Sequence, residues 1–125
     1  MTESQLLARM SEPAFYREPT KRVDVIQTHI STIFLTDSFA YKVKKPVDFG
    51  FLDYTTLAKR RVMCEREVEL NARLCPDTYL GVVEIREHNG VLALGGPGKT
   101  VEYAVKMVRL PQERMLREVL QRGEG

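Results

Sequence analysis

The chain of 125 residues is 43% hydrophobic and 29% charged, with a formal net charge of +2. These proportions are typical of one soluble globular domain, and the small net charge excludes the strong basic field of a dedicated nucleic-acid binder. Apolar runs are too short to span a membrane, no signal-peptide layout opens the chain, and two cysteines, Cys64 and Cys75, are too few for a disulfide scaffold. We therefore expect a cytoplasmic protein with reduced thiols, no membrane partner and no nucleic-acid partner.

The first half of the chain predicts a short helix followed by three strands. Apolar residues at helical spacing indicate a helix over residues 4–10, behind Thr2 or Ser4 as its N-cap. Prolines interrupt that spacing, so we expect residues 11–21 to form a lead-in segment. β-Branched and aromatic runs then predict strands at residues 23–26, 32–35 and 39–43.

The second half predicts a long helix, three strands and a closing helix. Asp53 or Thr55 is the expected N-cap of the long helix, which runs to about Leu74. Strands are predicted at residues 82–86, 91–94 and 101–108. The Asn-Gly pair between the first two is a strong hairpin signal, and Pro111 is expected to open the closing helix.

Short connections between these strands indicate an antiparallel sheet against which the long helix packs. The predicted fold class is therefore α+β, with five to six antiparallel strands, one long packed helix and short helices at both ends. Alternation in the last strand predicts that one face carries Val101, Tyr103, Val105 and Met107.

Two charged residues, Lys42 and Glu67, do not fit the apolar faces of these elements. In the third predicted strand the bulky side chains occupy one face, and Lys42 lies in mid-strand on the other face with the small Ala40. On the long helix, the neighbours of Glu67 at helical spacing form an expected apolar stripe of Met63, Cys64, Leu70, Asn71 and Leu74. A carboxylate that faces a core needs a partner, because burying it alone costs several kcal/mol.

Lys42 is the natural partner of Glu67. A lysine held under a sheet by a helix carboxylate is suited to bind phosphate oxygens, and Ala40 leaves room for a flat ring. Lys44 shares this face but lies nearer the strand end, which makes it the weaker candidate. Each residue also has an ordinary interpretation, as a solvated strand lysine or a glutamate that reaches outward, but their order within one small unit favours a functional pair.

The order strand lysine, then helix glutamate, is that of the V-A-I-K strand and the following helix of protein kinases. A more specific resemblance covers nearly the whole chain, from about Leu6 to Gln121. It is carried by Thr28-His29-Ile30-Ser31, Ala40-Tyr41-Lys42-Val43-Lys44-Lys45-Pro46-Val47, Phe51-Leu52-Asp53, Leu70-Asn71-x-Arg73-Leu74 and Tyr79-Leu80-Gly81-Val82-Val83. These strings resemble the N-terminal lobe of the aminoglycoside phosphotransferase-like kinases, in particular a bacterial branch often fused to a P-loop ATPase domain.

The resemblance implies a kinase-like N-lobe that binds ATP. Lys42 would contact the α- and β-phosphates, and Glu67 would hold Lys42 in place. Residues 107–110 would link the two lobes, with Met107 at the start of this segment and backbone groups of Val108 and Leu110 bonded to adenine. Residues 28–31, which end at Ser31, would take the place of the phosphate-covering loop, although they carry no glycine.

The resemblance also implies that the catalytic and metal-binding residues lie in a C-terminal lobe, so we assign neither kind in this chain. Residues 1–22 would form the N-terminal helix and lead-in, residues 23–110 the nucleotide-binding lobe, and residues 111–125 the start of the connection to the missing lobe. Mg²⁺ is expected only with that lobe, which would also select the small-molecule acceptor of the γ-phosphate.

Two other motifs resemble known signatures only in spelling. Residues 95–100 approach a P-loop, but that motif requires glycine where Ala93 stands and must open a helix, whereas the residues after Thr100 alternate as a strand. A hairpin turn is therefore expected, and a P-loop nucleotide binder is the less favoured alternative. Asp48-Phe49-Gly50 spells the metal-binding tripeptide of kinases but lies between the lysine strand and the helix rather than in the other lobe.

The alternative from another class is a non-catalytic interaction module built on a kinase-like lobe. An isolated lobe exposes the faces that would meet its partner, so this alternative predicts self-association. The surfaces expected to take part are the sheet edge near Met107 and a stripe formed by Met115, Leu116, Val119 and Leu120.

Overall fold

The structure is a computed structural model that describes residues 1–48, 50 and 53–110. Its elements in chain order are α1 (Glu3–Met10), the 3₁₀ helix η1 (Pro13–Phe15), β1 (Asp24–Gln27), β2 (Ser31–Leu35), β3 (Phe39–Lys44), α2 (Leu57–Leu74), β4 (Tyr79–His88), β5 (Val91–Leu94) and β6 (Lys99–Val108). The closing helix predicted from Pro111, and with it the segment 111–125, lies outside the described residues. In the part that the structure describes, no helix is both long enough and apolar enough to cross a membrane.

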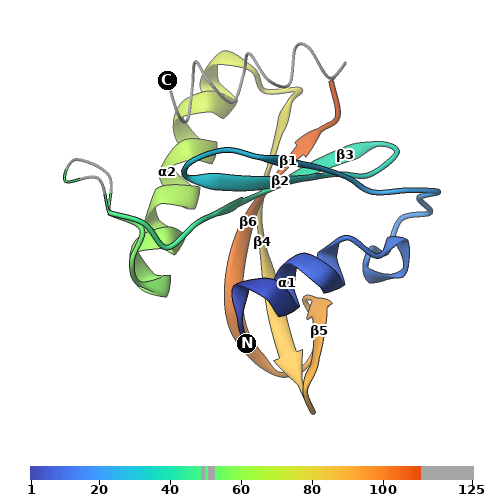
Figure 1. Cartoon of the computed structure of the whole chain (residues 1–125). Helices are drawn as coiled ribbons and strands as arrows, with labels where there is room; N and C mark the ends of the chain where they lie inside the picture. Colours follow the sequence, from blue (N-terminus) through green and yellow to red (C-terminus); the bar gives the residue numbers. More distant parts are fainter. Residues whose placement is uncertain (49, 51–52, 111–125) are drawn as a thin grey trace.

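The strands of the described residues form one antiparallel sheet in the order β1-β2-β3-β6-β4-β5 (Figure 1). Strand β6 is central, because it pairs with β3 on one side and with β4 on the other. It therefore joins the first three strands to the β4–β5 hairpin. The predicted α+β class, with an antiparallel sheet of up to six strands and one long helix packed on it, is confirmed, and β4 is several residues longer than predicted.

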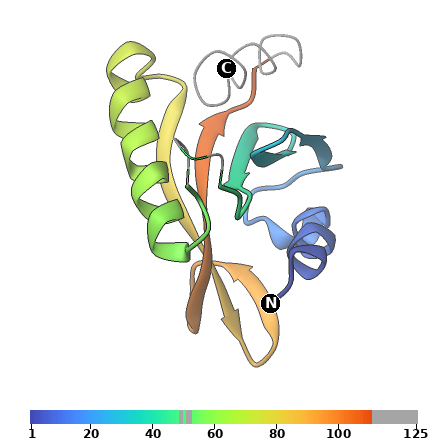
Figure 2. The same ribbon diagram turned by 60° about the vertical axis from the view of Figure 1, so that its left-hand side comes forward.

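The two helices lie on opposite sides of the sheet, with α2 along β4 and β6 (Figure 2). Each side has its own hydrophobic core. The first core joins α1 and η1 to the sheet and includes Leu6, Met10, Phe15, Phe34, Tyr41 and Val43. The second core joins α2 to the sheet and includes Ile33, Leu35, Ala40, Cys64, Val105 and Met107. The alternation predicted for β3 is therefore confirmed, since Tyr41 and Ala40 belong to different cores.

The cap of α1 is predicted correctly and the cap of α2 is not. Thr2 accepts a hydrogen bond from the backbone N–H of Gln5 and completes a capping box with it. For α2 the cap is Thr56, whose hydroxyl accepts from the N–H of Lys59 at 3.2 Å. The expected cap Asp53 instead accepts from the N–H of Thr55 at 3.0 Å, so both candidate caps lie in the turn that precedes the helix.

A bulge in β6 overturns part of the predicted alternation. The pairing with β4 shifts between Ile85, opposite Glu102, and Arg86, opposite Thr100, which leaves Val101 as an extra residue. A single extra residue moves the side chains beyond it to the other face. Val101 accordingly packs against the first core, whereas Tyr103, Val105 and Met107 belong to the second, as predicted.

Candidate functional site

Strand β3 brings Lys42 and Ala40 to the face covered by α2, as the sequence predicts. Ala40 is fully buried in the second core, and the side chain of Lys42 is only 2% exposed. Lys42 pairs across the sheet with Val105 of β6, and Ala40 pairs with Met107. This lysine is therefore not a solvated residue on an open strand face.

Helix α2 turns Glu67 toward the sheet, but the stripe around it differs from the prediction. The buried residues of the helix are Arg60, Cys64, Glu67 and Asn71, which recur at intervals of three to four and so share one face. Leu70 and Leu74 were expected on that face and are 60% and 72% exposed. The inward position of Glu67 is thus confirmed, while the assignment of these two leucines to the core is wrong.

The carboxylate of Glu67 is shared by two lysines of β3. Lys42 Nζ donates to Oε2 at 3.2 Å, and Lys44 Nζ donates to Oε1 at 2.6 Å. The side chain of Lys44 is 3% exposed, and its ammonium also lies 5.1 Å from the centre of the Tyr54 ring. The predicted contact between Lys42 and Glu67 is present, and the contact of Lys44, the weaker candidate, with the same carboxylate was not predicted.

The charges of this cluster stabilise one another against burial. Burial by itself raises the pKa of Glu67, but the ammonium groups of Lys42 and Lys44 outweigh it, and the pKa lies below its usual value. Burial likewise lowers the pKa of Lys44, and the charge and hydrogen bond of Glu67 more than reverse the effect. Glu67 and Lys44 therefore remain charged at neutral pH. Burial raises the pKa of the neighbouring Cys64 thiol to about 12, so this thiol stays protonated.

The turn between β1 and β2, expected to take the place of a phosphate-covering loop, is closed by its own hydrogen bonds. The Thr28 hydroxyl accepts from the backbone N–H of Ile30 and of Ser31, at 3.4 and 3.0 Å. Lys45 Nζ donates to the Thr28 carbonyl at 2.6 Å. In contrast, the hydroxyl of Ser31 is buried and makes no hydrogen bond within the described ranges. Ser31 lies opposite Lys44 in the register of β2 and β3, so both side chains are on the α2 face.

The segment expected to contact adenine lies at the end of β6. Met107 is buried on a central strand, which contradicts the expectation that it lies at an exposed sheet edge. The backbone N–H of Val108 donates to the Thr78 carbonyl at 2.8 Å and is thus already engaged. Leu110 is half-buried and packs against the second core beside this strand. The other surface expected to mediate association, the stripe from Met115 to Leu120, lies outside the described residues.

The segment that resembles a P-loop is a turn between two strands, as expected. Strand β5 ends at Leu94, and Lys99 is the first residue of β6, so no helix follows the glycines. Gly98 has a φ of 112°, and a Cβ at this position would collide with the carbonyl oxygen of Glu87. Close backbone approach therefore explains this glycine. The described residues contain no group of three His, Cys, Asp or Glu side chains arranged to hold a metal ion.

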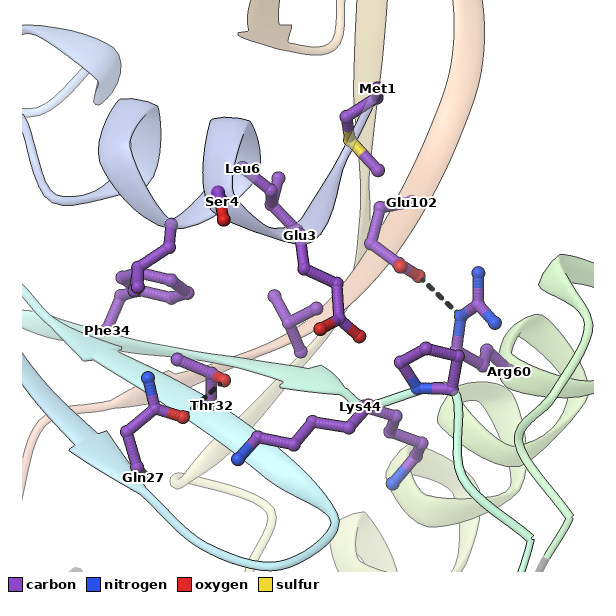
Figure 3. Close-up of a pocket in the computed structure, with 14 residues that line it drawn as sticks. Met1, Glu3, Ser4, Leu6, Gln27, Thr32, Phe34, Lys44, Arg60 and Glu102 are labelled. Carbon is purple, nitrogen blue, oxygen red and sulfur yellow. Dashed lines mark hydrogen bonds and ion pairs between the residues drawn. The ribbon is translucent and has the colours of Figure 1, made fainter.

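A cavity of about 420 Å³ lies between α1 and strands β1 to β3 and reaches Arg60 of α2 (Figure 3). Glu3 extends into it from α1, and Glu102 of β6 lies at its wall beside Arg60. Arg60 Nε donates to Glu102 Oε1 at 3.1 Å. The sequence does not predict this buried pair, because neither residue interrupts an expected apolar face of its helix or strand. Of the charged cluster, Lys44 lines this cavity, whereas Lys42 and Glu67 do not.

The fold and the cluster define an α+β domain in which two strand lysines and one helix glutamate meet beneath an antiparallel sheet. No family model matches the chain, and no solved structure matches it significantly. Three mycobacterial proteins do match, namely uncharacterized proteins Rv2004c and MT2060 of two Mycobacterium tuberculosis strains and Mb2027c of Mycobacterium bovis. Each is 40% identical to this chain over 68 residues, which amount to 54% of the chain and only 14% of the relative. The matched part of the chain therefore corresponds to a small fraction of these longer proteins.

Proposed function

We propose that this chain is the ATP-binding lobe of a small-molecule phosphotransferase of the aminoglycoside phosphotransferase-like type. The observation that carries the proposal is the buried contact between Lys42 of β3 and Glu67 of α2. Protein kinases also use a lysine on the third strand to contact the α- and β-phosphates of ATP, and a glutamate on the following helix to hold that lysine. The proposal includes a cytoplasmic location.

The donors on the α2 face suit a polyphosphate. Lys42 brings an ammonium group to this face of β3, Lys44 adds a second positive charge beside it, and the Ser31 hydroxyl on the neighbouring strand has no protein partner among the described residues. Phosphate oxygens accept strong hydrogen bonds from such groups. When bound, ATP would supply the γ-phosphoryl group for transfer to a substrate hydroxyl. Lys42 would hold the α- and β-phosphates, Glu67 would keep Lys42 in place, and Ser31 would offer a further donor.

The purine would lie on the side of the small Ala40, where the second core would have to open because Ala40 is fully buried. Ala40 and Met107 occupy paired positions on β3 and β6, next to the segment that ends at Leu110. Because the amide of Val108 is engaged by Thr78, hydrogen bonds to adenine would have to come from other backbone groups of residues 108–110. The catalytic residues, the Mg²⁺ ligands and the acceptor site would lie in another part of the protein.

The experiment that tests the proposal is a titration of the full-length protein with a fluorescent ATP analogue. Replacing Lys42 with Met removes the ammonium but keeps most of the apolar stem. A charge-assisted hydrogen bond contributes about 1.5–3 kcal/mol, so the Lys42→Met protein should bind the analogue about 10- to 100-fold more weakly.

The matched control is Lys59→Met, which removes an exposed lysine of α2 that pairs with Asp53 outside the cluster. This variant should bind the analogue like the parent protein. Equal affinity of the Lys42→Met protein and its parent, with both proteins folded, would contradict the proposal.

A non-catalytic interaction module is the second candidate, and one observation favours it. The outer side of α2 exposes Leu70 and Leu74, and Leu80 at the start of β4 is also largely exposed. Exposed leucines of this kind are found where proteins associate. This candidate predicts association through α2, with no need for Lys42.

A further inference from the structure

The shorter of the two contacts of Glu67 is not the one made by Lys42. Lys44 Nζ lies 2.6 Å from Oε1, whereas Lys42 Nζ lies 3.2 Å from Oε2. Lys44 thus engages one carboxylate oxygen, and the other oxygen is directed to Lys42. The side chain of Glu67 has several rotatable bonds, so a second anchor restricts where Oε2 can lie.

Lys44 is itself held from several sides. It is the last residue of β3, and its backbone is fixed by pairing with Ser31 of β2. Its ammonium lies 5.1 Å from the centre of the Tyr54 ring, a cation–π distance. Tyr54 is buried, and its carbonyl accepts a hydrogen bond from Arg60 at 2.8 Å. These contacts give Lys44 a fixed position from which to orient Glu67.

We propose that Lys44 is a positioning residue of the nucleotide site, which orients Glu67 so that Glu67 presents Lys42 to the phosphates. The proposal rests on the function proposed above, because it assigns a role within the same site. Two ammonium groups also keep the carboxylate ionised over a wider pH range than one. Without Lys44, Glu67 is protonated more easily and its carboxylate is less restricted, so it holds Lys42 in position less firmly.

The experiment compares binding of the fluorescent ATP analogue by the full-length protein and its Lys44→Met variant across the acidic range. Lys44→Met keeps Glu67 paired with Lys42, so the variant should fold. We expect about tenfold weaker binding at neutral pH. We also expect the acid-side loss of binding to move upward by about one pH unit, since removing one neighbouring cation raises the pKa of a carboxyl group. Because ATP itself titrates, each variant is compared with the parent protein in the same buffer.

A double-mutant cycle separates positioning from the two other roles open to Lys44. If Lys44 acts through Glu67, the change Lys44→Met has little further effect on affinity once Glu67→Gln is present. If Lys44 contacts phosphate directly, Lys44→Met weakens binding by the same factor whether residue 67 is Glu or Gln, and the proposal is overturned. If Lys44 only supports the fold, its loss lowers the melting temperature but leaves unchanged both the affinity and the acid limb, that is, the pH range over which binding is lost in acid. This result would also overturn the proposal.

Two further variants keep this test decisive. Should Lys44→Met fail to fold, Lys44→Gln retains a donor for Oε1 without the charge, and the acid limb should still move upward. Lys44→Arg retains the charge, and its acid limb should remain that of the parent protein. An unmoved acid limb in the Lys44→Gln protein would refute the role of Lys44, whereas normal affinity of the Lys42→Met protein would refute the nucleotide site itself.

Discussion

Among the described residues, buried ion pairs join α2 to the sheet at two places, which differ in composition. Near the start of the helix, Arg60 donates to Glu102 of β6 at 3.1 Å. Two turns later, Glu67 accepts from Lys42 and Lys44 of β3. The first pair joins one guanidinium to one carboxylate, and the second divides one carboxylate between two ammonium groups. Both lie on the same face of the same helix.

Burial by itself raises the pKa of both glutamates, but their net pKa shifts have opposite directions. For Glu102, burial outweighs the hydrogen bond from Tyr103 and the charge of Arg60, so its pKa is raised. For Glu67, burial is outweighed by the two lysines, so its pKa is lowered. A buried ion pair is therefore not in itself a sign of function. The cluster at Glu67 differs because one carboxylate accepts hydrogen bonds from two buried lysines, an arrangement that the proposed phosphate site would use.

The largest effect on stability is expected from Glu67→Leu. This change removes the carboxylate and leaves Lys42 and Lys44 buried without it. Loss of one partner from a buried ion pair costs about 3–5 kcal/mol, because the remaining buried charge loses the attraction of that partner. The free energy of unfolding in urea measures the loss. A cost below about 0.5 kcal/mol, as for an ordinary surface change, would mean that the lysines are hydrated and the cluster is not buried in solution.

A second, smaller effect concerns the pH dependence of stability. Because the pKa of Glu67 is lowered, its contribution is present above the usual value of 4.5 and is lost as the pH falls through the lower folded-state pKa. Because the pKa of Glu102 is raised, its contribution is present below 4.5 and is lost as the pH rises through the higher folded-state pKa.

The variants Glu67→Gln and Glu102→Gln should therefore change stability in opposite ways. Relative to the parent protein, Glu67→Gln should be least stable at neutral pH and should recover on the order of 1 kcal/mol in acid. The stability of Glu102→Gln relative to the parent protein should be highest at neutral pH and should fall in acid. Unfolding curves measured between pH 3 and pH 7, about the range in which carboxyl groups titrate, would show the two trends. Parallel curves for both variants would contradict the contrast between the pairs.

The core of the candidate site can be predicted from sequence because it depends on local periodicity. Alternation in β3 separates Lys42 from the bulky residues, and the helical period turns Glu67 inward. Lys44 is ranked as the weaker candidate, although it occupies the same face two residues later, because position near a strand end does not reveal how far a flexible lysine reaches. Its contact with Glu67 depends on where α2 crosses the sheet, which no local pattern specifies.

The other errors have the same tertiary origin. The bulge at Val101 arises from pairing with β4 and leaves no mark on the alternation of β6 itself. The cavity beside α1 and the pair of Arg60 with Glu102 join residues far apart in the chain. Leu70 fits an apolar stripe by spacing, but the sheet contacts the face of α2 that carries Cys64 and Glu67.

The smallest effect on stability is expected from Leu70→Ser and Leu74→Ser. Both residues lie on the outer side of α2, away from the ion pairs that join the helix to the sheet. Both side chains are exposed, so each change should alter the free energy of unfolding by no more than about 0.5 kcal/mol. ATP-analogue binding should remain that of the parent protein, because neither residue touches the cluster. Light scattering provides the second readout. If the double variant abolishes self-association while nucleotide binding is absent from the parent protein, the interaction module replaces the phosphotransferase lobe as the better account of this fold.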